Sequence, residues 1–378
     1  MKKYTKQQLS ELYSSRREKL VLKMKEQNIA AIIFEDCEDR RDISIRYLCG
    51  HTSDAMLIIT SDGKSTLVAW DENLAKENAL VDKIIPSTRY ERSNIRAAKA
   101  VLNAFKTSGK QNVEVTPALP YPVFLQYVDA LAGWDIRCRE NSLHDFVTDM
   151  RSVKDEYEIE CTREAARIGD RIIDLIEKKV KSGEIKTETD VALLIEKECR
   201  KDGCERTGFD TLAAGPARSF AIHAFPGYTD GVWPGEGLSI LDFGVVYNGY
   251  TSDTTLTVMK NASKKQKALV NAVVEASKKC LEFYKDGVPI KAASEKADKI
   301  FAKSSMKMPH SLGHGIGLDI HEKPFIKASN ANVFKCGNIV TLEPGLYQAE
   351  LGGVRLENDV LITEKGNEVI THSRIIEL

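Results

Sequence analysis

The chain has 378 residues, of which 42% are hydrophobic and 29% charged, as is typical of a globular protein with a substantial core. Its 54 basic and 55 acidic residues give a formal charge of −1, so no overall attraction to nucleic acid or to an anionic membrane is expected. No apolar run approaches the roughly 18 residues of a membrane span. The start, MKKYTKQQLSEL, lacks the apolar stretch of a secretory signal, so we expect a cytoplasmic protein.

The length predicts two domains, and the pattern of predicted helices and strands changes near residues 140–150. Residues 1–145 predict an α/β domain. His51 and His144 stand alone in this part, which favours structural or surface roles. Asp62-Gly63 predicts a hairpin between the second and third strands. The expected helices are residues 7–27, 94–105 and 122–131, and the expected strands are 30–34, 55–60 and 65–70.

Residues 146–378 predict a second domain of mixed α/β (α+β) class. The last 70 residues of this part are rich in β-branched residues and glycine and hold most of the histidines. The eight cysteines are scattered without a CxxC pair, so we expect reduced thiols rather than a disulfide or zinc framework. The expected helices are residues 155–181, 187–201, 264–284 and 290–303.

The segment SILDFGVVYNGYTSDTTLTV, residues 239–258, predicts a β-hairpin around Asn248-Gly249. If Tyr247 faces Tyr250, then Asp242 lies opposite Thr255 and Asp253 opposite Gly244. The two aspartates then share one face as diagonal neighbours, roughly 7–8 Å apart at Cα, close enough to hold a small cation together. For the hairpin considered by itself, an equally good interpretation is that this face is exposed to solvent and that the two aspartates have no function.

The segment HSLGHGIGLDIHEKP, residues 310–324, holds three of the seven histidines. Its alternating glycines argue against a helix and indicate backbone that passes close to a ligand or to another segment. Neutral imidazole is a common ligand for transition metals and the usual acid–base group near neutral pH. A single histidine would more often be a core residue, but three together favour a functional site.

Two glutamates follow in apolar strand contexts, Glu343 in TLEPGLY and Glu357 in GGVRLENDVLIT. A charged carboxylate in such a context is costly unless it is paired or bound to metal. Arg355 lies two residues before Glu357, so a simple ion pair is an alternative. Pro344-Gly345 and Gly352-Gly353 interrupt the strands, and the sequence leaves open whether the two glutamates share a face.

These residues resemble the five metal ligands of the pita-bread metallopeptidases, a family that includes methionine aminopeptidase, aminopeptidase P and prolidase. The resemblance is strong from about Met150, and the stretch MRSVKDEYEIECTREAA looks like the entry to the catalytic domain of aminopeptidase P and prolidase. Before Met150 the resemblance is limited to the presence of a separate N-terminal α/β domain. It implies a creatinase-like N-terminal domain (1–145) and a pita-bread catalytic domain (146–378). The residues matching the ligands in type and order are Asp242, Asp253, His314, Glu343 and Glu357.

The resemblance implies a dinuclear peptidase that hydrolyses the Xaa-Pro bond at peptide N-termini through a metal-bridging hydroxide. Four carboxylates and one imidazole carry a charge of −4, which two divalent cations cancel; Mn²⁺ or Co²⁺ fits best, and Zn²⁺ or Fe²⁺ would be accepted. By resemblance, Asp253 and Glu357 bridge the metals, Asp242 completes one of them, and His314 with Glu343 completes the other. Glu343 would also take the proton of the attacking water.

The resemblance further implies that His223, His310 and His321 bind substrate, stabilise the oxyanion or pass a proton to the leaving amine. Arg355 would orient Glu357. The chain departs from the family where Thr254-Thr255-Leu256 follows Asp253 instead of Ile-Thr-Arg. His223 stands 19 residues before Asp242, further than usual, and Lys323 to Lys327 hold no arginine for a substrate carboxylate, which weakens strict dipeptidase specificity.

We therefore expect a metallopeptidase, aminopeptidase P-like or prolidase-like, that acts on small peptides with proline at the second position. A homodimer is expected from resemblance only, and neither nucleic acid nor membrane is an expected partner. Two alternatives share the fold. One is a creatinase-like hydrolase that works without metal, and the other is a non-catalytic peptide-binding scaffold. The complete ligand set argues against both, because such relatives lose ligands.

Overall fold

A computed structural model describes residues 4–105 and 109–378 of the chain. It divides into two compact units, one ending at Met150 and the other running from Arg151 to Leu378. The expected boundary between residues 145 and 146 falls inside helix α6 (Leu143–Ser152). Within the described residues, no helix combines the length and the apolar character needed to cross a bilayer. None of the eight cysteines is disulfide-bonded there.

The N-terminal unit is built on a six-stranded sheet of order β4-β3-β2-β1-β5-β6. The predicted strands and helices form nearly at the expected residues, and β2 pairs with β3 in the antiparallel hairpin that Asp62-Gly63 predicts. The strands are β1 (Ala31–Asp36), β2 (Ala55–Thr60), β3 (Ser65–Ala69), β4 (Lys83–Pro86), β5 (Gln111–Val115) and β6 (Trp134–Arg137). The helices are α1 (Lys6–Glu26), α2 (Ser44–Cys49), α3 (Glu72–Asn78), η1 (Ser87–Tyr90), α4 (Asn94–Ala104) and α5 (Tyr121–Ala130), followed by α6.

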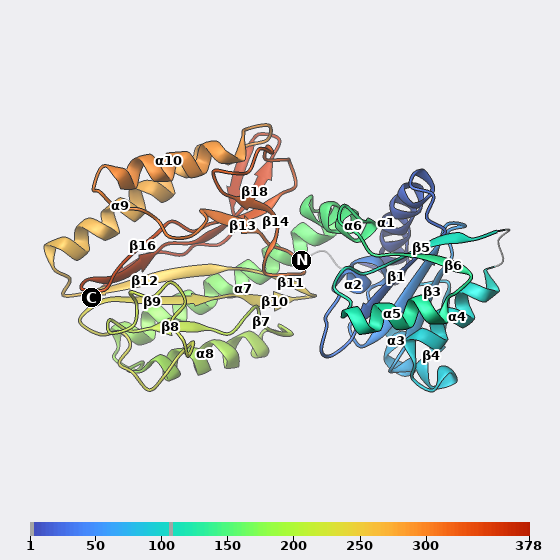
Figure 1. Cartoon of the computed structure of the whole chain (residues 1–378). Coiled ribbons are helices and arrows are strands. Elements are labelled where there is room, and N and C mark those ends of the chain that lie inside the picture. The colour runs from blue at the N-terminus through green and yellow to red at the C-terminus, as the bar shows by residue number, and fades with distance from the viewer. Residues whose placement is uncertain (1–3, 106–108) are drawn as a thin grey trace. The chain divides into compact units, whose positions relative to one another are not determined.

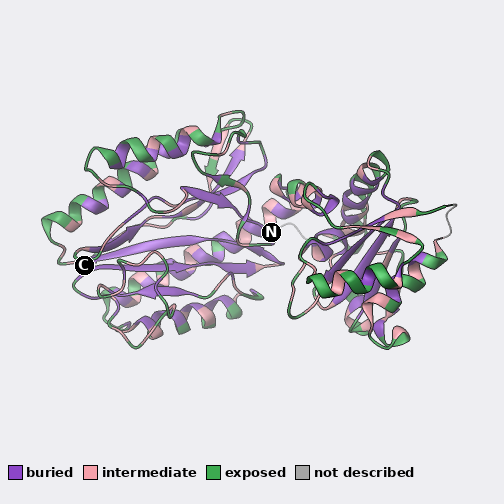
Figure 2. Ribbon diagram, in the orientation of Figure 1, coloured by how far each residue is buried: buried purple, intermediate pink, exposed green. Residues whose placement is uncertain are grey.

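Buried side chains on the strands fix the layers of this unit. Ile33 and Ile58 pack against Leu102 of α4 and Tyr127 of α5 in one apolar cluster. Figure 2 shows the strands as largely buried and the outer faces of the helices as exposed. His144 is buried and its ring lies 4.5 Å from that of Phe34. His51 is also buried, so the structural alternative holds for both histidines and the surface alternative is wrong.

In the second unit, α9 and α10 lie along one side of the strands and α8 lies along the opposite side (Figure 1), while α7 packs against α8. The helices are α7 (Glu156–Lys181), α8 (Glu188–Lys201), α9 (Lys264–Leu281) and α10 (Ile290–Ala302). The strands of the first half are β7 (Arg206–Thr207), β8 (Leu212–Ala214), β9 (Gly237–Phe243), β10 (Val245–Tyr247), β11 (Tyr250–Thr251) and β12 (Thr254–Lys260). Those of the second half are β13 (Gly313–Gly315), β14 (Glu322–Ile326), β15 (Ile339–Leu342), β16 (Gly345–Gln348), β17 (Gly352–Arg355), β18 (Asn358–Thr363), β19 (Gly366–Val369) and β20 (Ile375–Glu377).

The helices begin where the sequence offers caps. Asp155 and Thr187, the residues before α7 and α8, accept hydrogen bonds from backbone N–H groups of the first turn in complete capping boxes. The main sheets have the orders β20-β12-β9-β8 and β14-β13-β15-β18-β19. An isolated antiparallel bridge joins Thr255 of β12 to Glu357, which lies between β17 and β18. This bridge brings the two halves of the unit together at the candidate ligands.

The hairpin around Asn248-Gly249 has the predicted register. Tyr247 faces Tyr250, and Asp242 faces Thr255. The predicted pairing of Asp253 with Gly244 falls outside both ladders, however, because one ladder stops at the pair Phe243–Thr254 and the other begins at the pair Val246–Thr251. Gly244 lies at this interruption, where an added Cβ would be 1.9 Å from the carbonyl oxygen of Ser252. The close approach leaves no room for a side chain at this position and therefore requires glycine.

Candidate metal centre

Every candidate site residue lines one cavity of about 470 Å³ in the second unit. They come from strand ends and from the turns between strands, where backbone can bend toward a common point. Asp253 and Glu357 are buried, whereas His223 and His321 are exposed. The nine residues are His223, Asp242, Asp253, His310, His314, His321, Glu343, Arg355 and Glu357. The side chains thus converge although the sequence spreads them over more than a hundred positions.

The floor of the cavity holds potential ligand atoms at short range. One such atom each from Asp253, His314 and Glu357 lies within 4.8 Å of the other two. His314 Nε2 lies 3.6 Å from Asp253 Oδ2 and 3.5 Å from Glu343 Oε1. His314 Nδ1 donates to the carbonyl of Gly315 at 3.1 Å, so its Nε2 presents the lone pair toward the carboxylates. This orientation suits a metal ligand.

The carboxylates of the cavity oppose one another electrostatically. Burial, reinforced by Glu357 and Asp242, raises the pKa of Asp253 well above its usual range. Burial also raises the pKa of Glu357, and it raises that of Glu343 to about 7. Asp242 Oδ1 is buried and has no hydrogen-bond partner among the residues that the structure describes. In their ionised forms these carboxylates carry more negative charge than the cationic side chains of the cavity neutralise.

The imidazoles do not supply the missing positive charge. Burial lowers the pKa of His310 and of His314 to about 4 each, so both are neutral at pH 7. The rings of His314 and His321 lie 4.3 Å apart between centroids. Neutral imidazole and excess carboxylate form the donor set of a divalent transition-metal site. The residues present thus fit the metal ions that the sequence predicts.

Arg355 is the single arginine that lines this cavity within the described residues. Its Nη2 donates to Asp242 Oδ2, while its Nε lies 3.9 Å from Glu357 Oε2. The simple Arg355–Glu357 pair considered from the sequence is therefore the weaker of its two carboxylate contacts. Thr255 completes the connection, because its Oγ1 accepts from Arg355 Nε at 2.9 Å and donates to Glu357 Oε2 at 2.5 Å.

Sequence reasoning missed three residues that contact candidate ligands or other residues of the candidate site. Thr255 is one of them. It follows Asp253 by two residues, and this spacing could have indicated that the two side chains lie on the same face of the strand. Tyr347 accepts from Arg355 Nη1 at 2.7 Å and donates to His310 Nε2 at 3.1 Å. Asp359 Oδ2 accepts from the backbone N–H of Asp253 at 3.0 Å. Asp359 is a carboxylate in the apolar strand NDVLIT, the same signal that singled out Glu357.

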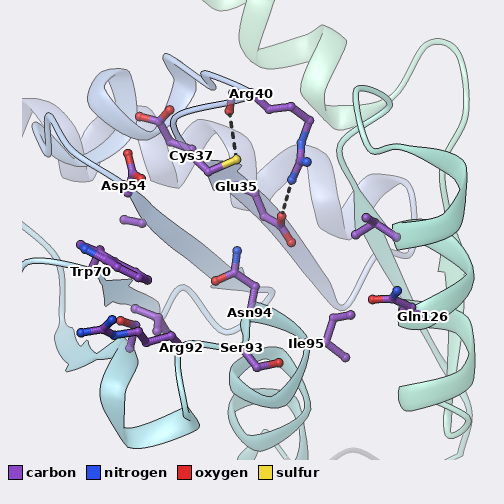
Figure 3. A pocket seen from close by; sticks show the side chains of 15 residues that line it. Glu35, Cys37, Arg40, Asp54, Trp70, Arg92, Ser93, Asn94, Ile95 and Gln126 are labelled. Atoms are coloured by element: carbon purple, nitrogen blue, oxygen red, sulfur yellow. Dashed lines mark hydrogen bonds and ion pairs between the residues drawn. The ribbon is translucent and has the colours of Figure 1, made fainter.

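A cavity of about 380 Å³ in the N-terminal unit provides a contrast (Figure 3). Its carboxylates are compensated by arginine: Glu35 lies 3.0 Å from Arg40. Arg41 lies 3.4 Å from Asp36 and 2.6 Å from Asp54. This cavity has no excess of carboxylate for a metal ion to neutralise, so charge balance distinguishes the two cavities.

Comparison with protein families places this architecture in the class of two-domain metallopeptidases. Residues 160–364 match the model of metallopeptidase family M24, and residues 16–133 match the creatinase/prolidase N-terminal domain. The first match covers more than half of the chain, which therefore belongs to metallopeptidase family M24. The expected family and two-domain α/β fold are confirmed. Membership implies divalent metal ions, while the ligand assignments stay predictions.

Individual relatives agree with the family. The chain is 34% identical over 230 residues to a protein from Pyrococcus horikoshii named Xaa-Pro dipeptidase, covering 60% of this chain and 64% of the relative. Less than two thirds of that relative is therefore matched. A structure of Xaa-Pro dipeptidase from Bacillus anthracis aligns with 97% of this chain and 100% of its own, with a TM-score of 0.83 and 26% identity. The structure of X-Pro aminopeptidase from Thermotoga maritima aligns with 96% of this chain and 100% of its own, with a TM-score of 0.81 and 27% identity.

Proposed function

We propose that the chain is a dinuclear metallopeptidase that hydrolyses the bond between an N-terminal residue and proline in small peptides. The observation that carries this proposal is the buried excess of carboxylate around the neutral ring of His314, at the floor of a cavity large enough for a short peptide. The names of the similar proteins support the Xaa-Pro specificity. Both a dipeptidase and an aminopeptidase preference are compatible with it.

Five residues would hold the two metal ions: Asp242, Asp253, His314, Glu343 and Glu357. We assign Asp253 and Glu357 as the bridging pair. Mn²⁺ or Co²⁺ suits the oxygen-rich set best, with Zn²⁺ or Fe²⁺ as alternatives. Bound divalent cations would lower the pKa of water and withdraw electron density from the scissile carbonyl.

The chain's own groups would then move protons and hold the peptide. Glu343, whose Oε1 lies 3.5 Å from His314 Nε2 at the floor of the cavity, would accept the proton of the attacking water. His310 Nδ1 donates to the carbonyl of Ser311 at 2.8 Å and lies 3.7 Å from Glu343 Oε2. That position suits the passage of a proton toward a leaving amine. The exposed His223 and His321 lie where they can contact the peptide.

The deciding experiment compares Ala-Pro with a longer peptide that has proline second, each with and without Mn²⁺ and after exhaustive chelation. We expect cleavage that depends on metal and is lost when proline is replaced by alanine. Cleavage of neither peptide with metal present would refute the specificity. Activity that survives chelation would favour a creatinase-like hydrolase. Purified protein without bound metal and without hydrolysis would favour a non-catalytic scaffold.

Three broader features belong to the same proposal. We assign residues 1–145 to an N-terminal domain and 146–378 to the catalytic domain. We also propose a homodimer, which gel filtration tests, and a cytoplasmic location, which cell fractionation tests. Elemental analysis of protein purified without added metal would identify the physiological cation.

A further inference from the structure

The segment between β8 and β9, residues 215–236, forms one wall of the candidate cavity without contributing a helix or strand among its described residues. It carries His223 and Phe225, and the side chain of Phe225 is 95% exposed. Because such a segment lacks a hydrogen-bond ladder, its conformation depends on contacts with other elements. Those contacts decide where His223 lies.

Glu188, the first residue of α8, ties the start of this segment to a point more than halfway along it. Its side chain is 1% exposed. Oε1 accepts from the backbone N–H of Gly215 at 2.8 Å. Oε2 accepts from the backbone N–H and the hydroxyl of Thr229, at 2.8 and 2.6 Å. A single buried carboxylate thus bonds to residues 14 positions apart in the chain.

Arg218 extends this connection toward His223. Its Nε lies 3.2 Å from Glu188 Oε1, and its Nη2 donates to the carbonyl of Pro226 at 2.6 Å. On the other side of His223, the carbonyl of Ile222 accepts from Arg355 Nη1 at 3.2 Å. His223 is therefore bracketed by two anchored carbonyls, one held by Arg218, which pairs with Glu188 of α8, and one held by Arg355 of the candidate site.

The base of the segment packs closely against its surroundings. The N–H of Glu188 donates to the carbonyl of Gly231 at 2.9 Å, and that of Thr189 donates to the carbonyl of Thr229 at 3.1 Å. An added Cβ on Gly215 would lie 2.2 Å from the carbonyl oxygen of Val232. Little room remains for the base to shift while the carboxylate bonds are intact.

We propose that Glu188 is a positioning residue which, through Arg218 and the backbone of Gly215 and Thr229, fixes His223 at the mouth of the cavity for peptide binding. This inference rests on the proposed function, because it assigns to His223 a role toward the peptide substrate. Glu188 itself touches neither the substrate nor the candidate ligands. Its effect reaches the peptide through the segment that carries His223.

The test is Glu188→Gln in the full-length, metal-loaded enzyme. Glutamine keeps the shape but turns an NH₂ group toward N–H donors and removes the charge opposite Arg218. We expect kcat/KM for an Xaa-Pro peptide to fall about tenfold, mainly through KM, with metal content unchanged. Glu198→Gln is the matched control, because Glu198 is a buried glutamate of the same helix whose Oε2 lies 3.1 Å from Arg171. It should change kcat/KM less than about twofold.

A double-mutant cycle separates positioning from general destabilisation. If Glu188 acts through His223, then Glu188→Gln adds less than about twofold to the loss already caused by His223→Ala. A full additional tenfold loss in the double variant would overturn the proposal. Equal losses in Glu188→Gln and Glu198→Gln would overturn it too. If Glu188→Gln does not fold, Arg218→Gln takes its place, with the same expected direction and the same cycle.

Amide hydrogen exchange gives a readout that does not depend on activity. Residues 215–232 should exchange at least about tenfold faster in Glu188→Gln than in the wild type or in Glu198→Gln. Unchanged exchange would overturn the positioning role. If the wild type cleaves no Xaa-Pro peptide, the proposed function fails, and the exchange experiment alone still decides whether Glu188 holds the segment.

Discussion

Asp253 is the residue on which the candidate site depends most directly. Its carboxylate lies among Asp242, Glu357 and the ring of His314, and its backbone N–H is held by Asp359. In Asp253→Asn the amide keeps the shape but removes one negative charge from the metal position. We expect kcat to fall by at least about a thousandfold and the metal content per chain to decrease, as measured by elemental analysis.

The control for this variant is Asp174→Asn. Asp174 is exposed and lies 2.6 Å from Arg374, so its removal should leave both activity and metal content unchanged within error. Wild-type turnover by Asp253→Asn, or an unchanged metal content, would contradict its assignment as a bridging ligand.

Thr255 offers a finer test at the same scale. Its hydroxyl joins the guanidinium of Arg355 to the carboxylate of Glu357, so it orients a candidate ligand without lining the cavity. Thr255→Val keeps the shape and removes both hydrogen bonds. We expect metal affinity to weaken about tenfold, as measured by titration of the metal-free protein.

Thr162→Val separates this effect from the general cost of burying valine in place of threonine. Thr162 is equally buried, and its hydroxyl donates to the carbonyl of Glu158 within α7. The control should lose stability without losing metal affinity. An equal decrease of metal affinity in the two variants would contradict the orienting role of Thr255.

Among the elements, β13 shows why the histidine-rich segment carries its alternating glycines. An added Cβ on Gly313 would lie 2.1 Å from the carbonyl oxygen of Thr341, so β13 and β15 approach too closely for any side chain there. Gly313→Ala must displace the strand that carries His314. We expect the unfolding free energy to decrease by about 1–3 kcal/mol and metal binding to weaken, as measured by denaturant unfolding and elemental analysis.

Gly133→Ala is the matched substitution, because an added Cβ there would meet nothing within 4 Å. It should leave metal binding unchanged. Normal metal binding by Gly313→Ala would show that β13 can move without displacing His314, contrary to the close packing.

The start of β14 is held by a buried ion cluster. Glu322 lies 2.6 Å from Arg151 and 2.7 Å from Lys154, and all three side chains are buried. Although burial opposes ionisation, the charges of Lys154 and Arg151 lower the pKa of Glu322 to about 2. The ionised carboxylate therefore stabilises the fold above pH 4.5, its usual pKa, and this contribution disappears as the pH falls through 4.5 toward 2.

We expect the unfolding free energy to decrease over this pH range by roughly 3 kcal/mol on account of Glu322, since one unit of pKa corresponds to about 1.4 kcal/mol. Denaturant unfolding of the second unit at pH 6, 4 and 3 measures the slope. In Glu322→Gln the protein should be less stable at pH 6 and the slope should be smaller. Equal slopes in the wild type and the variant would contradict this contribution.

At the scale of the whole molecule, the carboxylate excess predicts that metal binding stabilises the folded chain. Binding to the folded state alone adds about 2.7 kcal/mol when free metal is 100 times its dissociation constant. For a domain of 150–250 residues that is roughly 5–10 °C in Tm. Thermal unfolding with and without Mn²⁺ should show this increase in the wild type and a much smaller one in Asp253→Asn. An unchanged Tm in the wild type would contradict a metal site.

Local patterns predicted most of the elements of both units. Capping residues such as Asp155 and Thr187 define helix starts, because each accepts a hydrogen bond from an N–H group only three residues further along the chain. In the same way, Asn248-Gly249 defines the register that places Asp242 opposite Thr255. The interruption at Gly244 could not be predicted in this way. The hairpin rule assumes an unbroken ladder, whereas Gly244 approaches the carbonyl of Ser252 so closely that an added Cβ would lie 1.9 Å from its oxygen.

The sequence by itself determined the elements, the type and order of the candidate ligands, and the family to which the chain belongs, because these depend on residue type and short spacing. Only the tertiary structure decided that Glu343 and Glu357 line the same cavity, that Arg355 donates to Asp242, and that Glu188 holds the segment of His223. The physical reason is that burial, and contacts between residues distant in the chain, arise when separate strands and helices pack together. Periodicity within one segment carries no information about which remote groups will share its low-dielectric surroundings.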